Sequence, residues 1–360
     1  MSASEPPALA DSAGADARDP DRIASLAFDS FMRRYWDPKL RFFYARSDHS
    51  NAGRNHIRPG EGHYSDFWWE AQLWDLVIDE AERTRSTEAI AMVHRVYDGF
   101  VAQFPDFGSD YNDDRGWWAL ASTRAFELTH NRRYLHRAEQ LLDGILGQRD
   151  GTYGGGIWWR RSVRDQKNVA TNAPAVETAI RLCRMTGDQR YCDAAGSLFG
   201  WLDRSIRDGD RILDHIEGPG DGRLVDWQFT YNYGTYLGAA THLYRLTGDE
   251  KYRDKAIQAG EKAIAVLAPD GILHPEGRGD AGGFRGIFVR NLAFAARQLH
   301  RQDFLDFLGR NADAAWAARQ EDGLIGESWT SRATGVIESL TAQSGVAVIQ
   351  AAADADRRTP

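Results

Sequence analysis

Apolar residues recur along most of this chain at intervals of three and four, the spacing that places them on one face of an α-helix. Polar or glycine-rich segments separate the periodic stretches. The pattern predicts twelve helices, and the fold class is therefore expected to be all-α. The expected helices cover residues 21–35, 66–84, 87–104, 114–129, 132–147, 171–186, 189–206, 232–247, 250–267, 284–299, 302–319 and 335–352.

A short motif recurs at three of the predicted helix junctions. Its copies begin at Thr129, Thr186 and Thr247, which are 57 and 61 residues apart, and each places a Tyr five residues and an Ala nine residues after the Thr. In the second and third copies Gly-Asp follows the Thr, and this pair can end one helix and cap the next. The period suits a repeating pair of antiparallel helices.

Six such hairpins favour a closed (α/α)6 barrel with inner and outer helix layers over an open solenoid. Turns after the three motif threonines are short, whereas segments 148–168, 207–230 and 268–283 are long and rich in glycine and aromatic residues. If the short turns lie on one rim of the barrel and the long loops on the other, the long loops would surround a single opening of the barrel. Small β-hairpins could form in these long loops, for example around residues 154–161.

Composition narrows the class of protein. The 360 residues carry a formal net charge of -8, which argues against a general nucleic-acid or anionic-membrane binder, because such proteins concentrate Lys and Arg. No run reaches the roughly 18 apolar residues of a membrane span. We expect a monomer with a disordered tail at 1–20, one (α/α)6 domain at 21–352 and a short tail at 353–360.

The N-terminal residues lack a basic stretch followed by an apolar one, so they do not resemble a secretory signal. We therefore expect a cytoplasmic protein, or an extracytoplasmic one if an export segment has been removed. The two cysteines, Cys183 and Cys192, fall inside helical patterns. This position predicts small core residues rather than a disulfide framework.

The segment at 110–121 holds the strongest candidate chemistry, because Asp113 and Asp114 precede Trp117 and Trp118 at the start of a predicted helix. At such a junction two carboxylates can stand about 5 Å apart, as in retaining glycosidases. The helix N-terminus would keep one ionised, and apolar walls would raise the pKa of the other. The same pair could instead simply cap the helix and supply its first-turn charge.

Six of the twelve tryptophans occur as adjacent pairs. Neighbours on a helix point in different directions, so one member of each pair can join the core while the other reaches the inner surface or rim, where aromatic rings stack on sugars. These pairs are Trp68-Trp69, Trp117-Trp118 and Trp158-Trp159.

No metal or organic cofactor is expected. The segment from Asp110 begins like a calcium loop, but Arg115 and Ala121 occupy the places of its glycine and closing glutamate. The ten histidines form no zinc-binding pair on a helix.

Three further segments combine amide, carboxylate or phenol groups with small residues, at 171–175, 213–215 and 229–234. Their polar residues could line a cleft or cap helices. Likewise, Glu177, Arg285 and Arg290 could be buried ion pairs.

Taken together, these motifs resemble glycoside hydrolase family 76, the endo-α-1,6-mannanases. The resemblance spans most of residues 20–350. It rests on Tyr111-Asn-Asp113-Asp114 with Trp117-Trp118-Ala-Leu-Ala121, Trp68-Trp69-Glu-Ala71, Gly155-Gly-Ile-Trp158-Trp159, Lys167-Asn168 with Thr171-Asn-Ala-Pro-Ala175, Thr230-Tyr-Asn232 with Gly234-Thr235, and Phe284-Arg-Gly-Ile-Phe288 with Arg290.

The resemblance implies an (α/α)6 barrel and hydrolysis or transglycosylation of α-1,6-linked mannan or manno-oligosaccharides with retention of configuration. Asp113 would be the nucleophile and Asp114 the general acid/base. Tyr233 and Asn112 depart from the family pattern without removing the pair. The residues then expected to bind substrate are Trp68, Trp118, Trp158, Asn172, Asp214 (by its match to a further family aspartate), Tyr231, Asn232 and Arg285.

Two other classes of function remain open from the sequence. One is a different sugar enzyme on the same barrel, such as an unsaturated-uronide hydrolase or a sugar epimerase. The other is a glycan-binding or envelope-assembly protein without catalysis.

Overall fold

The computed structural model describes residues 19–52 and 62–357. Residues 1–18 of the predicted N-terminal tail lie outside this part. The described residues form twelve α-helices, and the chain is all-α in character, as predicted. The helices are α2 (Pro20–Tyr35), α3 (Phe67–Thr84), α4 (Thr87–Gln103), α5 (Asn112–Thr129), α6 (Arg132–Leu146), α7 (Val169–Thr186), α8 (Gln189–Ser205), α9 (Thr230–Thr247), α10 (Glu250–Leu267), α11 (Phe284–Gln298), α12 (Gln302–Ala317) and α13 (Ser339–Arg357).

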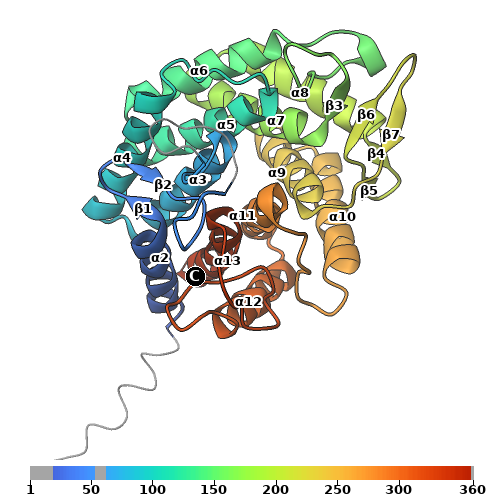
Figure 1. Cartoon of the computed structure of the whole chain (residues 1–360). Helices are drawn as coiled ribbons and strands as arrows, with labels where there is room; N and C mark the ends of the chain where they lie inside the picture. Colours follow the sequence, from blue (N-terminus) through green and yellow to red (C-terminus); the bar gives the residue numbers. More distant parts are fainter. Residues whose placement is uncertain (1–18, 53–61, 358–360) are drawn as a thin grey trace, which may run out of the picture.

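The helices form two concentric layers (Figure 1). Helices α3, α5, α7, α9, α11 and α13 each contact the next, and α13 contacts α3, so the inner ring is closed. Helices α4, α6, α8 and α10 pack outside the inner helix that precedes them, and α12 packs against α11 and α13. Helix α2 completes the outer layer by packing on α13, so the first and last helices form the sixth pair. The (α/α)6 barrel prediction is confirmed.

The two layers differ in how their side chains are buried. Outer helix α6 buries Tyr134, Ala138, Leu141 and Ile145, which recur at three to four residues along one face. Inner helix α9 is buried on every side from Thr230 to Leu243, as a helix enclosed by neighbours must be. Polar side chains of the inner layer therefore reach solvent mainly at its ends.

The junction motif works as its sequence predicts. Gly187 adopts the left-handed conformation with φ of 73° and ends α7, and the Asp188 carboxylate then accepts a hydrogen bond from Arg190 N to cap α8. Gly248 and Asp249 do the same between α9 and α10. These local bonds explain the short turns at the two junctions, and all five connections from an inner helix to the next outer one are short and lie on one rim of the barrel.

The opposite rim carries the long loops. A three-stranded antiparallel sheet of β3 (Gln166–Asn168), β6 (His215–Glu217) and β7 (Arg223–Val225) joins two of them. The remaining strands form two small ribbons, β1 (Trp36–Asp37) with β2 (Phe42–Phe43) and β4 (Arg207–Asp208) with β5 (Arg211–Ile212).

Small hairpins of the kind that the sequence allowed in the long loops form at β4–β5 and β6–β7, but the segment at 154–161 forms no regular ladder. A 3-10 turn, η1 (Thr152–Gly154), precedes two glycines, and isolated bridges pair Arg149 with Ile157 and Tyr111 with Arg160. Gly156 has φ of 79°, and a Cβ there would lie 2.7 Å from the Trp201 ring. The chain therefore bends against α8 instead of extending.

The domain limits change slightly. Asp19 caps α2 through its side chain, and the last helix continues to Arg357, beyond the predicted end at 352. The segment 353–357 is thus helix rather than tail, while 358–360 lie outside the described residues.

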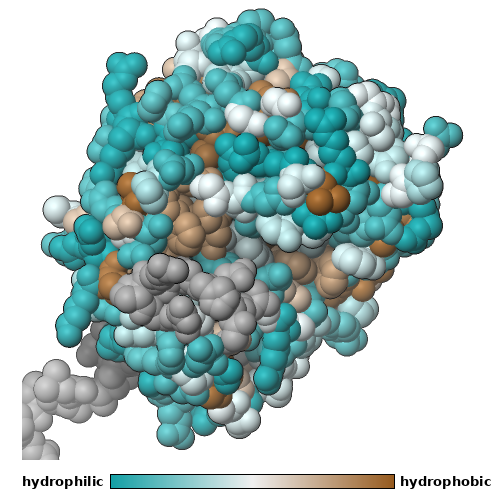
Figure 2. All heavy atoms as spheres, turned by 45° about the horizontal axis from the view of Figure 1, so that its top comes forward, coloured by the Kyte–Doolittle hydropathy of each residue, from teal (hydrophilic) through white to brown (hydrophobic). Residues whose placement is uncertain are grey.

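Within the described ranges, no helix is long and apolar enough to span a bilayer. Figure 2 shows a mostly hydrophilic face with hydrophobic residues in small groups.

The two cysteines form a disulfide, so the expectation of unbonded core residues is wrong. Cys183 lies in the last turn of α7 and Cys192 in the first turn of α8, with their Cα atoms 5.3 Å apart. The short turn between the two antiparallel helices places both cysteines side by side. The apolar pattern of either helix taken alone does not predict this proximity. The bond clamps one hairpin of the barrel.

We predict that this crosslink stabilises the fold. Its short loop limits the denatured chain, which by the chain-entropy account is worth about 2 to 3 kcal/mol. A reductant should therefore lower the melting temperature of the wild type but leave that of C183S/C192S unchanged. Two free thiols in the native, unreduced protein by mass spectrometry after alkylation would contradict the assignment.

Candidate active site

Asp113 and Asp114 lie in the first turn of α5, on the rim of the long loops. Tyr111 stands before the helix and makes no side-chain capping bond. Instead, the Asp113 Oδ1 atom accepts a hydrogen bond of 3.0 Å from Asp114 N. The pair thus supplies first-turn charge, which the helix dipole favours, and both residues remain partly accessible to solvent.

Asn112 fixes the 148–168 loop against this helix end. Its backbone N donates to Trp159 O and its Nδ2 to Trp158 O, both at 2.8 Å. The Trp159 indole is thereby placed to donate from Nε1 to Asp113 Oδ2 at 2.9 Å. Asp113 therefore accepts one hydrogen bond on each carboxylate oxygen.

The surroundings of the pair raise the pKa of both carboxyl groups. Burial raises the pKa of Asp113 to about 7, against the hydrogen bonds from Trp159 and the backbone, which favour the ionised form. Burial, followed by the charge of Asp113, raises the pKa of Asp114 well above its usual range, although Ser109 Oγ donates to it at 2.7 Å. Asp113 is thus placed to ionise first, while Asp114 keeps its proton.

A third carboxylate, Asp280, faces this pair from the 3-10 segment η2 (Gly279–Gly283). Its Oδ1 accepts hydrogen bonds from Trp68 Nε1 at 3.2 Å and Trp69 Nε1 at 2.9 Å. Its charge contributes to the raised pKa of both Asp113 and Asp114. Sequence reasoning missed Asp280, because a glycine-rich segment without periodicity gives no sign of where its carboxylate points.

Aromatic rings border the pair. Trp68, which is partly exposed, has its ring centroid 6.5 Å from those of Trp117 and Phe284. The Tyr111 ring lies 4.9 Å from that of Trp159 on the other side. Among the tryptophans predicted to bind substrate, Trp68 is therefore the one placed to stack on a sugar ring. Its indole is hydrogen-bonded to Asp280, which faces the aspartate pair, and part of its ring reaches solvent.

Three further predicted residues form one buried cluster. Tyr231 OH donates to Asp214 Oδ2, and Asn232 Nδ2 donates to the same oxygen at 3.2 Å. His215 Nδ1 lies 2.6 Å from Asp214 Oδ1. Burial, then the charge of Asp214, raises the pKa of Tyr231, and the charge of Asp113 contributes as well. The cluster therefore adjoins the aspartate pair across the mouth of the barrel.

Trp118 and Asn172 lie in the core and do not line a cleft. Trp118 is fully buried, donates from Nε1 to Phe67 O at 2.9 Å and stacks on Phe100. Asn172, also fully buried, bonds both the N and the O of Ile157 through its amide. Both side chains therefore support the backbone around the site. On α5 it is Trp117, not Trp118, that faces the interior of the barrel.

Trp158 and Arg285 are likewise buried supports. Trp158 donates to Asp150 Oδ2 at 2.7 Å, and Lys167 Nζ lies 4.6 Å from the centre of its ring. Arg285 is 1% exposed, stacks over Trp329 and donates to backbone carbonyls of the loops around it. Among the described residues Arg285 forms no ion pair, so the buried pair that the sequence allowed for it is not seen there.

Helix α5 continues from this site to the other end of the barrel. Its inward residues after Asp113 include Trp117, Leu120 and Arg124, which line a separate cavity of about 480 Å³ at the short-turn rim. Trp117 thus lies between the aspartates and this cavity. The carboxylate chemistry and the cavity belong to opposite ends of the same ring.

The fold and the consecutive carboxylates at its mouth are those of a glycoside hydrolase barrel. The profile of glycosyl hydrolase family 76 matches residues 29–360, and the chain belongs to this family. An α-1,6-mannanase of Salegentibacter sp. HEL1_6, solved with α-1,6-mannotriose as an inactive variant with two consecutive aspartates replaced by asparagine, superposes with a TM-score of 0.85. The two are 27% identical, and the match covers 93% of this chain and 99% of that one.

Two further relatives differ in how much of their length this chain spans. The Lin0763 protein of Listeria innocua is 26% identical with a TM-score of 0.86, over 95% of this chain and 99% of that chain. The mannan endo-1,6-alpha-mannosidase DCW1 of Saccharomyces cerevisiae is 26% identical over 293 residues. That match covers 71% of this chain but 64% of the yeast protein, so this chain spans less than two thirds of that relative.

We predict that Asp280 raises the pKa values of the aspartate pair in solution. Asp280→Asn keeps an acceptor for the two indoles but removes a negative charge, so both carboxyls should ionise at lower pH. Carboxyl ¹³C NMR titration of the wild type and the variant measures this directly. Asp221→Asn, on an exposed loop, is the matched control, and equal titration curves for all three proteins would show that Asp280 does not act on the pair.

Proposed function

We propose that this protein is an endo-acting α-1,6-mannosidase that cleaves mannan backbones by double displacement, with retention of configuration. The observation that carries the proposal is the unequal environment of two adjacent carboxyls. Asp113 accepts two hydrogen bonds and ionises near pH 7, whereas Asp114 lies against that charge and keeps its proton. A nucleophile and a general acid need these two states.

In the first step Asp113 attacks the anomeric carbon, and Asp114 gives its proton to the glycosidic oxygen as that bond breaks. The product is an ester between the sugar and Asp113. In the second step Asp114 takes a proton from water, the water oxygen attacks the anomeric carbon, and the Asp113 carboxylate leaves. A sugar hydroxyl in place of water would give transglycosylation by the same route.

The surrounding residues then have specific roles. The Trp159 indole, 2.9 Å from Asp113 Oδ2, holds the nucleophile in orientation and stabilises its charge. Ser109 Oγ donates to Asp114 Oδ2 at 2.7 Å and so holds the general acid in orientation. Trp68 offers an aromatic face to a sugar ring, and the Asp214 cluster offers polar groups from the far side of the mouth. No resident metal or organic cofactor enters either step.

The substrate class comes from similarity. A bacterial relative of similar length, with matching fold, was solved with α-1,6-mannotriose, and the yeast relative is named for endo-cleavage of α-1,6-mannan. We therefore propose α-1,6-mannan or its oligosaccharides as substrate.

We predict that Asp113→Asn and Asp114→Asn each reduce hydrolysis of linear α-1,6-mannan by at least 10³-fold, because each removes one of two groups that act in sequence. Melting temperatures should be unchanged or higher, since a raised carboxyl pKa means that the charged form is disfavoured in the fold. Chromatography of the products gives the rates. Asp106→Asn, on the loop before α5, is the matched control and should be fully active.

The same assay separates the alternatives. Calorimetric binding of α-1,6-mannotetraose by a wild type that forms no products would identify a glycan-binding protein. Native-rate cleavage by Asp113→Asn would refute the assignment of the nucleophile.

A further inference from the structure

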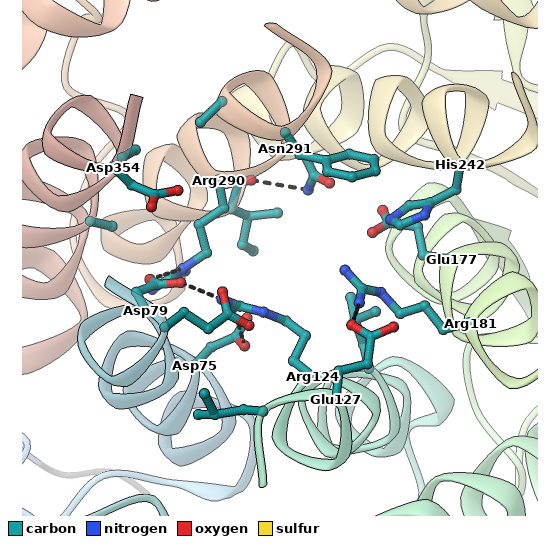
Figure 3. Close-up of a pocket in the computed structure, with 18 of the residues that line it drawn as sticks. Asp75, Asp79, Arg124, Glu127, Glu177, Arg181, His242, Arg290, Asn291 and Asp354 are labelled. Atoms are coloured by element: carbon teal, nitrogen blue, oxygen red, sulfur yellow. Dashed lines mark hydrogen bonds and ion pairs between the residues drawn. The ribbon is translucent and has the colours of Figure 1, made fainter. Parts of the chain in front are cut away.

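The cavity at the short-turn rim is lined by residues of all six inner helices, mostly from the middle and the C-terminal turns of each helix (Figure 3). It has a volume of about 480 Å³ and a wall dominated by charged side chains. It takes no part in the chemistry proposed above, which is placed at the other end of the barrel. Its two sides differ in how their charges are paired.

On the side of α3, α5 and α11 the charges satisfy one another. Arg124 forms ion pairs with Asp75, Asp79 and Glu82 at 2.6 to 2.9 Å. Arg290 pairs with Asp79 at 2.5 Å, as the sequence allowed. Because these contacts link three inner helices, this half of the wall is a structural network.

On the side of α7 and α9 positive charge is in excess. Arg181 pairs with Glu127, but Arg184 and Arg245 have no carboxylate within ion-pair distance among the described residues. Burial, followed by the charges of Arg184 and Arg181, lowers the pKa of Arg245. Three guanidinium groups therefore repel one another around one part of the cavity.

The same wall contains polar groups that are buried without a partner. Glu177 and His242, each 3% exposed, make no hydrogen bond within the described residues through Glu177 Oε1 or His242 Nδ1. Arg181 Nε is also buried and unpaired. Figure 3 shows Glu177, Arg181 and His242 together on one side of the cavity. Polar atoms buried in this way cost free energy unless something else bonds them.

Helix dipoles account for only part of this arrangement. Carbonyl groups at the ends of α7 and α9 favour nearby cations, which is sufficient reason for Arg184 and Arg245 in the last turns. They give no reason for an unpaired buried imidazole and carboxyl beside those arginines. Burial raises the pKa of Glu177 to about 8, so near neutral pH it is largely a neutral hydrogen-bond donor.

We propose that this wall is a binding site for a small oxyanion, a phosphate group, held by Arg181, Arg184 and Arg245 with His242 and Glu177 as buried hydrogen-bond donors. Guanidinium groups suit phosphate because their N–H groups match its oxygens. The cavity is larger than a bare phosphate requires and includes the Phe294 and Ile287 side chains, so it also has room for an organic group on the phosphate. The site is independent of mannan cleavage.

Isothermal titration with inorganic phosphate and with a hexose 6-phosphate, against sodium chloride at equal ionic strength, tests the proposal. Wild type should bind at least one of the two phosphates above the chloride background, and R184Q/R245Q should bind it at least tenfold more weakly. Tighter binding of the hexose 6-phosphate would assign the site to phosphate esters, whereas equal binding would assign it to the free oxyanion.

The matched control is R95Q/R204Q, which removes two exposed arginines from outer helices α4 and α8 and should bind like the wild type. The single variants R184Q and R245Q should each bind with intermediate affinity. Binding no stronger than that of chloride, or equal binding by R184Q/R245Q and the control, would overturn the proposal.

Discussion

Closure of the inner ring is the constraint on which the rest of the structure depends. Because α13 packs on α3, helices such as α9 have no solvent-facing side, and polar chemistry is confined to the two ends of the ring. The rim where the inner helices begin presents first-turn amides, which favour carboxylates such as Asp113 and Asp114. The rim where they end favours arginines for the same electrostatic reason.

At the mouth of the closed ring, the contact between Asn112 and the 148–168 loop sets the environment of the two carboxyls. Asn112, fully buried, ties the 148–168 loop to the start of α5 and so brings the Trp159 indole onto Asp113. Burial makes both carboxyls hard to ionise, and the indole bond favours the charge on Asp113 over that on Asp114. The division of roles proposed for the pair thus follows from the indole bond to Asp113 and from the charge of Asp113 on Asp114, while Asp280 raises the pKa of both.

The features that could be predicted from the sequence, the helices and their hairpin junctions, are those that depend on bonds between residues close in the chain. The junction motifs located the hairpins because capping involves neighbours. The predicted starts of α5, α7 and α9 were each two residues late. Trp118 was mistaken for a cleft residue because helix rotation in the ring decides which neighbour faces inward. The Cys183–Cys192 bond and Asp280 depend on contacts formed only after folding. The compartment and the oligomeric state stay predictions.

The central claim is that two adjacent carboxyls perform a double displacement at the mouth of this barrel. The most direct measurement is ¹H NMR of the anomeric protons during early hydrolysis of an α-1,6-manno-oligosaccharide by the wild type. The account predicts that the new reducing end appears first as the α anomer and only later mutarotates to the β anomer. First appearance of the β anomer would mean a single displacement by water and would contradict the role given to Asp113.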